Sequence, residues 1–328
     1  MTLILTRSDL EPLVDLRATV DAVDRAMGDV ARGAALQPAP ALMRLPGSDS
    51  GFLPMAAASA NAGLASVKLL ADVPSNAAAG RATQRSSLVL VSAETGETLA
   101  LLDGAVPTRM RTAAASAVAS RHLARPESTT LGLVGAGALA VAHVAAMLEV
   151  LPIDTVTFWT RSEETARAFQ AAVEHHGLLV KPLDSPRAVV ESADVVCTLT
   201  PSVTPIVSGD WFRPGLHVNA VGARPRPDHR EVDTAAMTRS RVFIDHLATV
   251  RAKSGDVVIP VADGDLQFED LEGELGEVIA GQRPGRRGRD DITLYKSVGI
   301  GLQDLAIGRL LLDAARAAGV GVDVDLGA

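Results

Sequence analysis

Three small residues at fixed spacing could hold a dinucleotide. Gly135, Gly137 and Ala140 form the pattern G-x-G-x-x-A. In such a pattern the first glycine makes a tight turn, the second lets a pyrophosphate approach the backbone, and the third residue permits close helix-strand packing. The start of the following helix offers unpaired N–H groups to phosphate oxygens. Because Ala and Gly are frequent in this chain, the pattern alone is weak evidence, and its value depends on the elements around it.

The surrounding sequence predicts the strand, turn and helix that this site needs. Leu131 to Val134 is a short apolar run, typical of a covered parallel strand. Ala138 to Met147 then continues without Pro or Gly, which favours a helix. A further strand is predicted at Thr155 to Trp159. This context favours a dinucleotide-binding unit.

The residues after that further strand bear on the choice of cofactor. Dehydrogenases that use NAD usually carry Asp or Glu there, to bind the ribose 2′-OH, whereas a nearby Arg accommodates a 2′-phosphate. Here Thr160, Arg161 and Ser162 follow the strand, and Glu163 and Glu164 come only inside the next helix. Ser162 can also cap that helix, a role compatible with a cofactor contact. The sequence therefore favours NADP(H), with NAD(H) as the other possibility.

Two cations in the first quarter of the chain have open interpretations. Arg44 is the lone cation of an apolar, proline-broken run, so it either faces solvent or binds an anion, because burying it unpaired is costly. Lys68 lies in a predicted strand, Ala65 to Leu70, on the face of Ser66. A solvent-facing lysine on an edge strand is the commoner case.

A third cation begins a helix. Arg111 and Thr112 lie in the first turn after Pro107, where a cation and the positive end of the helix dipole act together on an anion. The Ala and Ser residues that follow, through Ser120, permit close approach by another element.

The order of elements predicts the fold class. Strands at Asp194 to Leu199, Leu216 to Val221 and Arg241 to Ile244 alternate with helices, which is typical of a parallel sheet covered on both faces. Thr200 and the segment Asn219 to Gly222 lie at the carboxyl ends of such strands, and ligands of open α/β sheets lie outside these ends. We expect the small residues of the second segment to accommodate a flat nicotinamide ring.

The remaining segments are expected outside this sheet. Asp9 to Arg32 has the spacing of one amphipathic helix, and Gly301 to Ala318 that of a long terminal helix. A helix is also predicted at Leu271 to Ala280. Gly281 to Asp291 is polar and basic, and we interpret it as a solvated loop.

Composition excludes several classes of function. The 328 residues, 47% hydrophobic, can bury a large core. A net charge of −8 argues against nucleic acid. The seven histidines lack zinc-ligand spacing, and Cys197 lies in an apolar run typical of a core strand, so no metal site and no disulfide are expected. No window reaches about 18 apolar residues, and we expect no membrane partner and a cytoplasmic protein.

Four segments stand in an order that resembles one family. These are Arg111-Thr-Ala-Ala, Gly135-Ala-Gly, Asn219-Ala-Val-Gly-Ala, and Asp291-Ile-Thr-Leu-Tyr-Lys-Ser-Val-Gly. From about residue 51 to residue 304 the chain is similar to the ornithine cyclodeaminase/mu-crystallin family. The resemblance implies a homodimer of α/β chains. Residues 1–125 with 300–328 would form an α+β substrate and dimerisation domain, and residues 126–299 a Rossmann-type NAD(P)-binding domain with a doubly wound parallel sheet.

The resemblance also implies roles for individual residues. Arg44 and Arg111 would bind the carboxylate of a small amino, imino or keto acid, and Lys68 would face the substrate as a proton donor or as a third carboxylate contact. The residues expected to line the cofactor are Thr83, Arg111, Thr112, Gly135, Gly137, Ala138, Leu139, Arg161, Ser162, Thr200, Ala220, Val221, Gly222 and Ser297.

One departure from the family pattern bears on the reaction. Cyclodeaminases place an aspartate shortly after the N-A-x-G segment, where this chain has Arg224. The sequence around Asp228 is closer to the mu-crystallin pattern, and whether Asp228 enters the site stays open. We therefore expect an NADPH-dependent reductase of a small 2-imino carboxylate, or an amino-acid dehydrogenase. A cyclodeaminase that releases ammonia and an NADPH-dependent carboxylate-binding protein are the alternatives.

Overall fold

The computed structural model describes residues 1–327, which divide into two compact units. Unit 1 comprises Met1–Arg111 and the chain from Ile300 onward, and unit 2 comprises Thr112–Gly299. Helix α3 (Ala105–Leu123) runs across this boundary. The sequence placed the boundary after the helix, at residue 125, whereas the contacts divide the chain at Arg111, because the second half of α3 is buried within unit 2.

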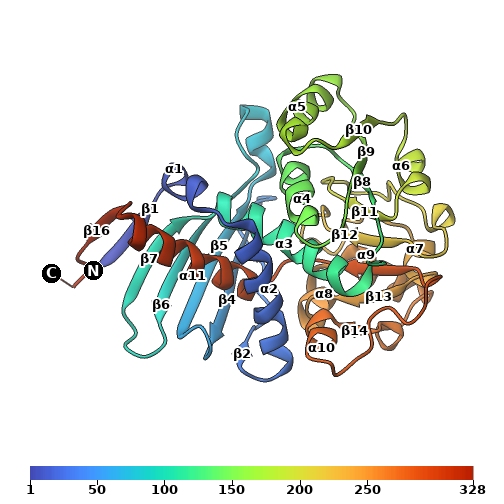
Figure 1. The fold of residues 1–328 in the computed structure, drawn as a ribbon. Helices are drawn as coiled ribbons and strands as arrows, with labels where there is room; N and C mark the ends of the chain where they lie inside the picture. The colour runs from blue at the N-terminus through green and yellow to red at the C-terminus, as the bar shows by residue number, and fades with distance from the viewer. Residues whose placement is uncertain (328) are drawn as a thin grey trace. The chain divides into compact units, whose positions relative to one another are not determined.

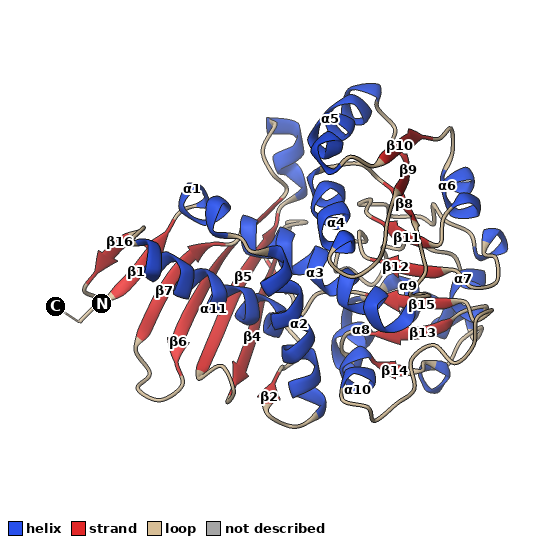
Figure 2. Ribbon diagram, viewed as in Figure 1, coloured by secondary structure: helices blue, strands red, loops and turns tan. Residues whose placement is uncertain are grey.

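Unit 1 is an α+β layer built on one sheet (Figures 1 and 2). Its strands follow the order β16-β1-β7-β6-β5-β4-β2, and β3 also pairs with β4. Neighbours are antiparallel except β1 and β7. The strands are β1 (Thr2–Leu5), β2 (Ala35–Leu36), β3 (Met43–Arg44), β4 (Gly51–Ser59), β5 (Leu64–Asp72), β6 (Gln84–Ser92), β7 (Thr98–Asp103) and β16 (Val322–Val324).

Two long helices cover one face of this sheet. Helix α11 (Gly301–Ala318) packs on β4, β5 and β6 and beside α2 (Leu16–Ala31). The predicted single helix from Asp9 is wrong at its start. The chain first forms α1 (Arg7–Leu10) and a 3₁₀ turn, η1 (Glu11–Leu13), and then Asp15 caps α2 by accepting a hydrogen bond from the Ala18 amide. Another 3₁₀ segment, η2 (Pro74–Ala79), follows β5.

The alternation of β5 separates two different faces. Ser66, Lys68 and Leu70 are buried on the covered side, whereas Val67 and Leu69 are each 45% exposed on the other. The solvent-facing interpretation of Lys68 is therefore wrong for this chain, because β5 is a central strand and its inward face lies under α11. Leu101 on β7 is likewise an exposed apolar residue.

Unit 2 is the predicted parallel sheet covered on both faces, and the fold class is confirmed (Figure 2). Its strand order is β10-β9-β8-β11-β12-β15-β13-β14, and every pair is parallel. The strands are β8 (Thr130–Val134), β9 (Thr155–Trp159), β10 (Leu179–Pro182), β11 (Val195–Thr198), β12 (His217–Ala220), β13 (Arg241–Ile244), β14 (Gly273–Glu274) and β15 (Thr293–Lys296).

Two apolar cores, one on each side of the sheet, hold the helices of unit 2. One core joins β8, β9 and β11 to α4 (Ala138–Leu148) and α5 (Glu163–Val173). The other includes side chains of α6 (Pro186–Ser192), α7 (Thr234–Thr238), α8 (Leu247–Lys253) and α9 (Gly255–Asp263). Short segments η3 (Glu174–His176), η4 (Gly209–Trp211), η5 (Phe268–Asp270) and α10 (Leu275–Ile279) complete the unit. The helix predicted from Leu271 is shorter, because Gly273 and Glu274 instead pair with β13.

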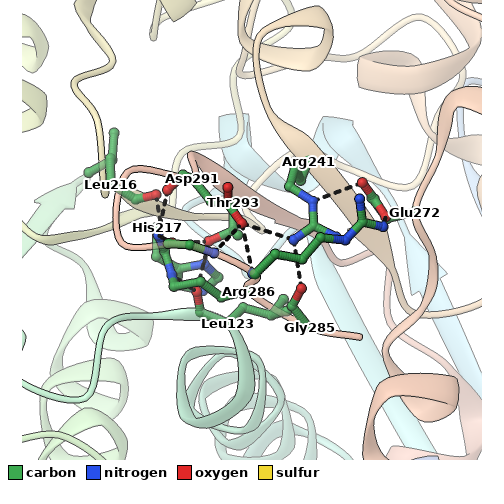
Figure 3. Close-up of polar contacts among 11 residues, drawn as sticks. Leu123, Leu216, His217, Arg241, Glu272, Gly285, Arg286, Asp291 and Thr293 are labelled. Atoms are coloured by element: carbon green, nitrogen blue, oxygen red, sulfur yellow. Dashed lines mark hydrogen bonds and ion pairs between the residues drawn. The ribbon is translucent and has the colours of Figure 1, made fainter. Parts of the chain in front are cut away.

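The basic segment Gly281 to Asp291 is only partly the solvated loop that its composition predicts (Figure 3). Arg286 is half-buried and donates hydrogen bonds to the carbonyl oxygens of Leu123, Leu216 and Asp291 and to the Thr293 hydroxyl. It therefore joins the end of α3 to the starts of β12 and β15. A charge run in sequence does not reveal such carbonyl acceptors, which come from distant segments.

Candidate functional site

The fold constrains the two glycines of the turn between β8 and α4 to different degrees. Gly135 has φ +104°, and a Cβ on it would come within 2.9 Å of the Leu199 carbonyl oxygen. The fold itself therefore requires glycine at this position. A Cβ on Gly137 would meet no atom within 4 Å. Packing does not require glycine there, whereas a ligand that approaches the backbone does.

The start of α4 can bind an anion. Gly137 occupies the N-cap position without a side-chain cap, and Gly137 and Ala138 are exposed. The amides of Ala138 and Leu139 at the first two helical positions have no acceptor within the helix. Together with the helix dipole they favour a phosphate group at this point. These features fit the pyrophosphate of a dinucleotide.

A pocket of about 330 Å³ opens beside this turn, across the carboxyl ends of β8, β9 and β11. The strand order reverses between β9 and β11 on either side of β8, which is where open α/β sheets bind ligands. The pocket contains four of the predicted cofactor residues, Gly135, Gly137, Arg161 and Thr200. The rest of its lining is Ala136, Trp159, Thr160, Thr165, Leu199, Pro201, Ser202 and Ile206.

Other residues predicted for the cofactor have structural contacts. The Ser162 hydroxyl accepts a hydrogen bond from the Thr165 amide and so caps α5. Ala220 is buried, and its carbonyl oxygen accepts from the Ser297 amide. Ser297 is also buried and donates from its hydroxyl to Asp245 at 3.5 Å. Leu139, Val221 and Gly222 are half-buried.

One carboxylate beneath the pocket was missed by sequence reasoning. Glu231 is fully buried. Its two carboxylate oxygens accept five hydrogen bonds at 2.6–2.9 Å. The donors are the hydroxyl of Thr198, the hydroxyl and amide of Thr200, and the amides of Gly222 and Ala223. Glu231 thereby connects the segment after β11 to the segment after β12. Gly222 is needed for this approach, because a Cβ there would lie 2.3 Å from the Thr200 amide nitrogen.

Further buried charges support Glu231. Asp256 accepts hydrogen bonds from the amides of Glu231 and Val232 and pairs with Lys296 at 2.8 Å. Burial raises the pKa of the Glu231 carboxyl, and the charge of Lys296 opposes that shift. Burial likewise raises the pKa of Asp245, against hydrogen bonds from the Val298 and Gly299 amides.

Unit 1 brings together two of the three predicted substrate-binding cations. Lys68 Nζ lies 2.6 Å from Asp304 Oδ2, and Arg111 Nε lies 3.2 Å from Asp304 Oδ1. Lys68 and Asp304 are fully buried, and Arg111 is 6% exposed. Arg111 also donates to the Gln303 amide oxygen at 3.0 Å, and Lys68 to the Thr108 hydroxyl at 3.3 Å. We call Lys68, Arg111 and Asp304 the ion triad.

The other predicted residues of unit 1 lie elsewhere. Arg44 is exposed on β3, and within residues 1–327 no hydrogen bond or ion pair connects it to the ion triad. Thr83 is half-buried just before β6, and its carbonyl accepts from the Val73 amide. Thr112, the first residue of unit 2, is buried in α3.

Asp304 was not predicted, although the sequence contains a signal for it. With Gln303 it is one of two polar residues between Leu302 and Leu305, and it is the only charged residue from Gly301 to Gly308. A carboxylate at such a position is expected to pair with a buried cation. Only the packing of α11 on β5 shows that the partner is Lys68.

Two other candidate groups do not enter the described sites. Asp228 is exposed, and within residues 1–327 no cluster of His, Cys, Asp or Glu could hold a metal ion.

Cys197 is buried in β11, and burial raises the pKa of its thiol to about 12. The thiol is therefore an unreactive part of the core. Among the helices of residues 1–327, none is both long and apolar enough to cross a bilayer.

Comparison with known proteins places the chain among enzymes of amino and imino acids. It is 31% identical over 320 residues to the alanine dehydrogenase of Archaeoglobus fulgidus, covering 98% of this chain and 97% of that protein. The structure of Thermococcus litoralis Delta(1)-pyrroline-2-carboxylate reductase in complex with NADH and L-proline matches with a TM-score of 0.93 and 31% identity, over 98% of this chain and 100% of that chain. An archaeal alanine dehydrogenase dimer with bound NAD matches with a TM-score of 0.93 and 29% identity, over 99% of both chains.

The family assignment agrees with these matches. Residues 1–319 match the family model described as Ornithine cyclodeaminase/mu-crystallin family, which includes the four segments that carry the resemblance in sequence. The chain belongs to the ornithine cyclodeaminase/mu-crystallin family.

Proposed function

We propose that this protein is an oxidoreductase that uses a nicotinamide cofactor to reduce a small 2-imino carboxylate, or the imine formed from a 2-keto acid and an amine. The observation that carries the proposal is the buried ion triad, in a chain that matches a reductase solved with NADH and L-proline along its whole length. When bound, a reduced nicotinamide supplies a hydride to carbon.

The residues of this chain would supply binding and proton chemistry. Arg111 and Arg44 would bind the substrate carboxylate, because a guanidinium presents donors that match two carboxylate oxygens. Lys68 would donate a proton to the substrate nitrogen or contact the carboxylate. In unit 2, the glycine turn and the start of α4 would hold the pyrophosphate, and Thr200 and Ala220 to Gly222 would line the rest of the cofactor site.

We further propose that the cofactor is NADP(H). The three residues directly after β9 include no carboxylate, and Arg161 among them is an exposed pocket residue where a 2′-phosphate would be recognised. Arg161→Asp is expected to lower the preference for NADPH over NADH at least tenfold, with Arg167→Asp, on the following helix, as a matched control. Equal use of both cofactors by the parent protein would contradict the proposal.

The decisive experiment is a screen for NADPH and NADH oxidation. The substrates are cyclic pyrroline and piperideine carboxylates and open-chain 2-keto acids with and without amines. Lys68→Met is expected to lower kcat by more than tenfold while leaving the cofactor Kd nearly unchanged. Unchanged turnover in this variant would exclude Lys68 from the chemistry.

The same screen separates the alternatives. A cyclodeaminase would release ammonia from ornithine or lysine with NAD⁺ and without net NADPH consumption, whereas a carboxylate-binding protein would bind ligand without turnover. Arg224 stands where cyclodeaminases have aspartate, and Asp228 is exposed, so reduction is the function that these residues favour.

We also propose a homodimer that forms through the uncovered face of the unit 1 sheet. Val67, Leu69 and Leu101 are exposed apolar residues on central strands, and such a face usually marks a protein interface. Leu69→Asp is expected to convert a dimer to a monomer in analytical ultracentrifugation, whereas Leu179→Asp, an exposed change on β10, is expected to leave the dimer intact. A monomeric parent protein would refute the proposal.

A further inference from the structure

The proposed reaction uses the two cations of the ion triad and leaves the Asp304 carboxylate without a role. Asp304 lies in the first turn of α11, is fully buried, and contacts both cations through different oxygens. We propose that Asp304 is a positioning residue that holds Lys68 as an ammonium ion and fixes the direction of its proton. This inference rests on the proposed function, because the proton is intended for the substrate nitrogen.

The charges of the triad support this role. Lys68 and Arg111 carry two positive charges and Asp304 one negative charge, so the triad keeps a net charge of +1 that a substrate carboxylate could neutralise. A lysine buried among cations alone would tend to lose its proton, because desolvation and a like charge both disfavour the ammonium form. An ion pair at 2.6 Å has the opposite effect.

The surroundings of Lys68 indicate that its ion pair with Asp304 has a role other than packing the core. Asp304 from α11 and Arg111 from α3 face Lys68 with charge, and the Thr108 hydroxyl accepts a hydrogen bond from it. The residues opposite it on β4 and β6 are Met55 and Leu88, which are buried and apolar. Buried ion pairs often contribute no more stability than well-packed apolar residues of similar volume, which favours a functional reason for this one.

The proton transfer can be written with atoms and electrons balanced. One N–H bond of the Lys68 ammonium breaks and a new N–H bond forms on the substrate imine nitrogen, while the electron pair of the broken bond stays on Lys68 Nζ. The substrate carbon gains the hydride of the proposed nicotinamide, and the product is an amine. Water then returns a proton to Lys68 Nζ, which lies 2.6 Å from Asp304 Oδ2.

The first test measures Lys68 itself, in the protein without added cofactor. NMR of ¹⁵N-labelled lysine side chains, with Lys68→Met used for assignment, is expected to show that Lys68 keeps its proton beyond the usual lysine midpoint of about 10.4. Asp304→Asn is expected to lower this midpoint by at least one pH unit. A midpoint at or below the usual value in the parent protein would overturn the proposal, even if the variant did not fold.

The second test is the pH profile of kcat/KM for the imine found by the screen. In Asp304→Asn the basic limb is expected to move down by at least one pH unit, with a loss of at least tenfold at pH 8. Asp304→Glu, which keeps the charge, is expected to restore the parental limb in part. Asp313→Asn, which removes an exposed carboxylate of the same helix, serves as the control.

The two tests separate failure of this inference from failure of the proposed function. If no imine is reduced by the parent protein, the proposed function fails, and the NMR midpoints still decide whether Asp304 holds Lys68 charged. If the parent protein reduces imines but Asp304→Asn keeps the parental midpoint and pH profile, Asp304 is only structural and the inference is wrong.

Discussion

The two glycines of the β8 turn are alike in sequence and different in physical requirement. Gly135 is constrained by the fold, through its positive φ and the nearby Leu199 carbonyl. Gly137 faces open space. The three predicted substrate-binding cations differ in a similar way. Lys68 and Arg111 already form ion pairs with Asp304 inside the protein, whereas Arg44 is exposed.

This difference predicts that alanine at Gly135 mainly lowers the stability of the protein, whereas alanine at Gly137 mainly weakens cofactor binding. Gly135→Ala is expected to lower the free energy of unfolding by about 1–3 kcal/mol, because alanine is strained at this φ. Gly137→Ala is expected to change it by no more than about 1 kcal/mol, the usual effect of alanine at an N-cap. Gly137→Ala should nevertheless weaken binding of NADPH at least tenfold.

Urea unfolding and fluorescence titration with NADPH measure the two effects. If Gly137→Ala binds the cofactor as the parent does, no ligand approaches this backbone, and the assignment of the pyrophosphate site is wrong.

At the scale of elements, polar side chains rather than apolar ones fix the ends of the parallel strands. At the carboxyl ends, Glu231 joins the segments after β11 and β12. At the amino ends, Arg286 joins α3, β12 and β15 by donating to the carbonyl oxygens of Leu123 and Leu216 and to the Thr293 hydroxyl (Figure 3). Apolar packing positions whole helices and strands, whereas the hydrogen bonds of Glu231 position the segment after β11 that lines the pocket.

We expect Arg286→Met to lower the free energy of unfolding by about 2–3 kcal/mol, because three carbonyl oxygens and the Thr293 hydroxyl each lose one hydrogen bond in a partly buried setting. Arg289→Met is the matched control. Arg289 is in the same loop, but its side chain is 74% exposed and pairs with Glu127, so a change within about 1 kcal/mol is expected. Urea unfolding of both variants checks the difference, and equal effects would contradict the inward role of Arg286.

At the scale of the whole molecule, buried histidines make stability depend on pH. His143 on α4 bonds the Leu139 carbonyl and the Ser116 hydroxyl, and His217 on β12 bonds the Thr293 hydroxyl. Burial lowers the pKa of His143 to about 4 and that of His217 to about 3. Both histidines are therefore neutral in the folded protein well below the pH at which they become protonated in the unfolded chain.

Stability should consequently fall as the pH decreases from about 6.5, the ordinary histidine value, toward 4. In this window the unfolded state binds more protons, and each histidine contributes a loss of about 1.4 kcal/mol per pH unit. Below the folded pKa values this loss stops increasing. The free energy of unfolding, measured in urea at several pH values, should change with pH in this window by about 1.4 kcal/mol per pH unit less in His143→Gln than in the parent protein. An unchanged slope would mean that His143 is protonated in the folded protein.

The sequence by itself determined the parallel sheet, the glycine turn, the cations and the family, because these depend on local periodicity and on motifs a few residues long. It also marked Arg161 and Thr200, which lie directly after strands whose ends meet at one edge of the sheet. Only the tertiary structure decided which charges meet. Lys68 and Asp304 are 236 residues apart, and Glu231 binds segments up to 33 residues away. Whether a buried charge is paired depends on how distant elements pack, and no local pattern contains that information.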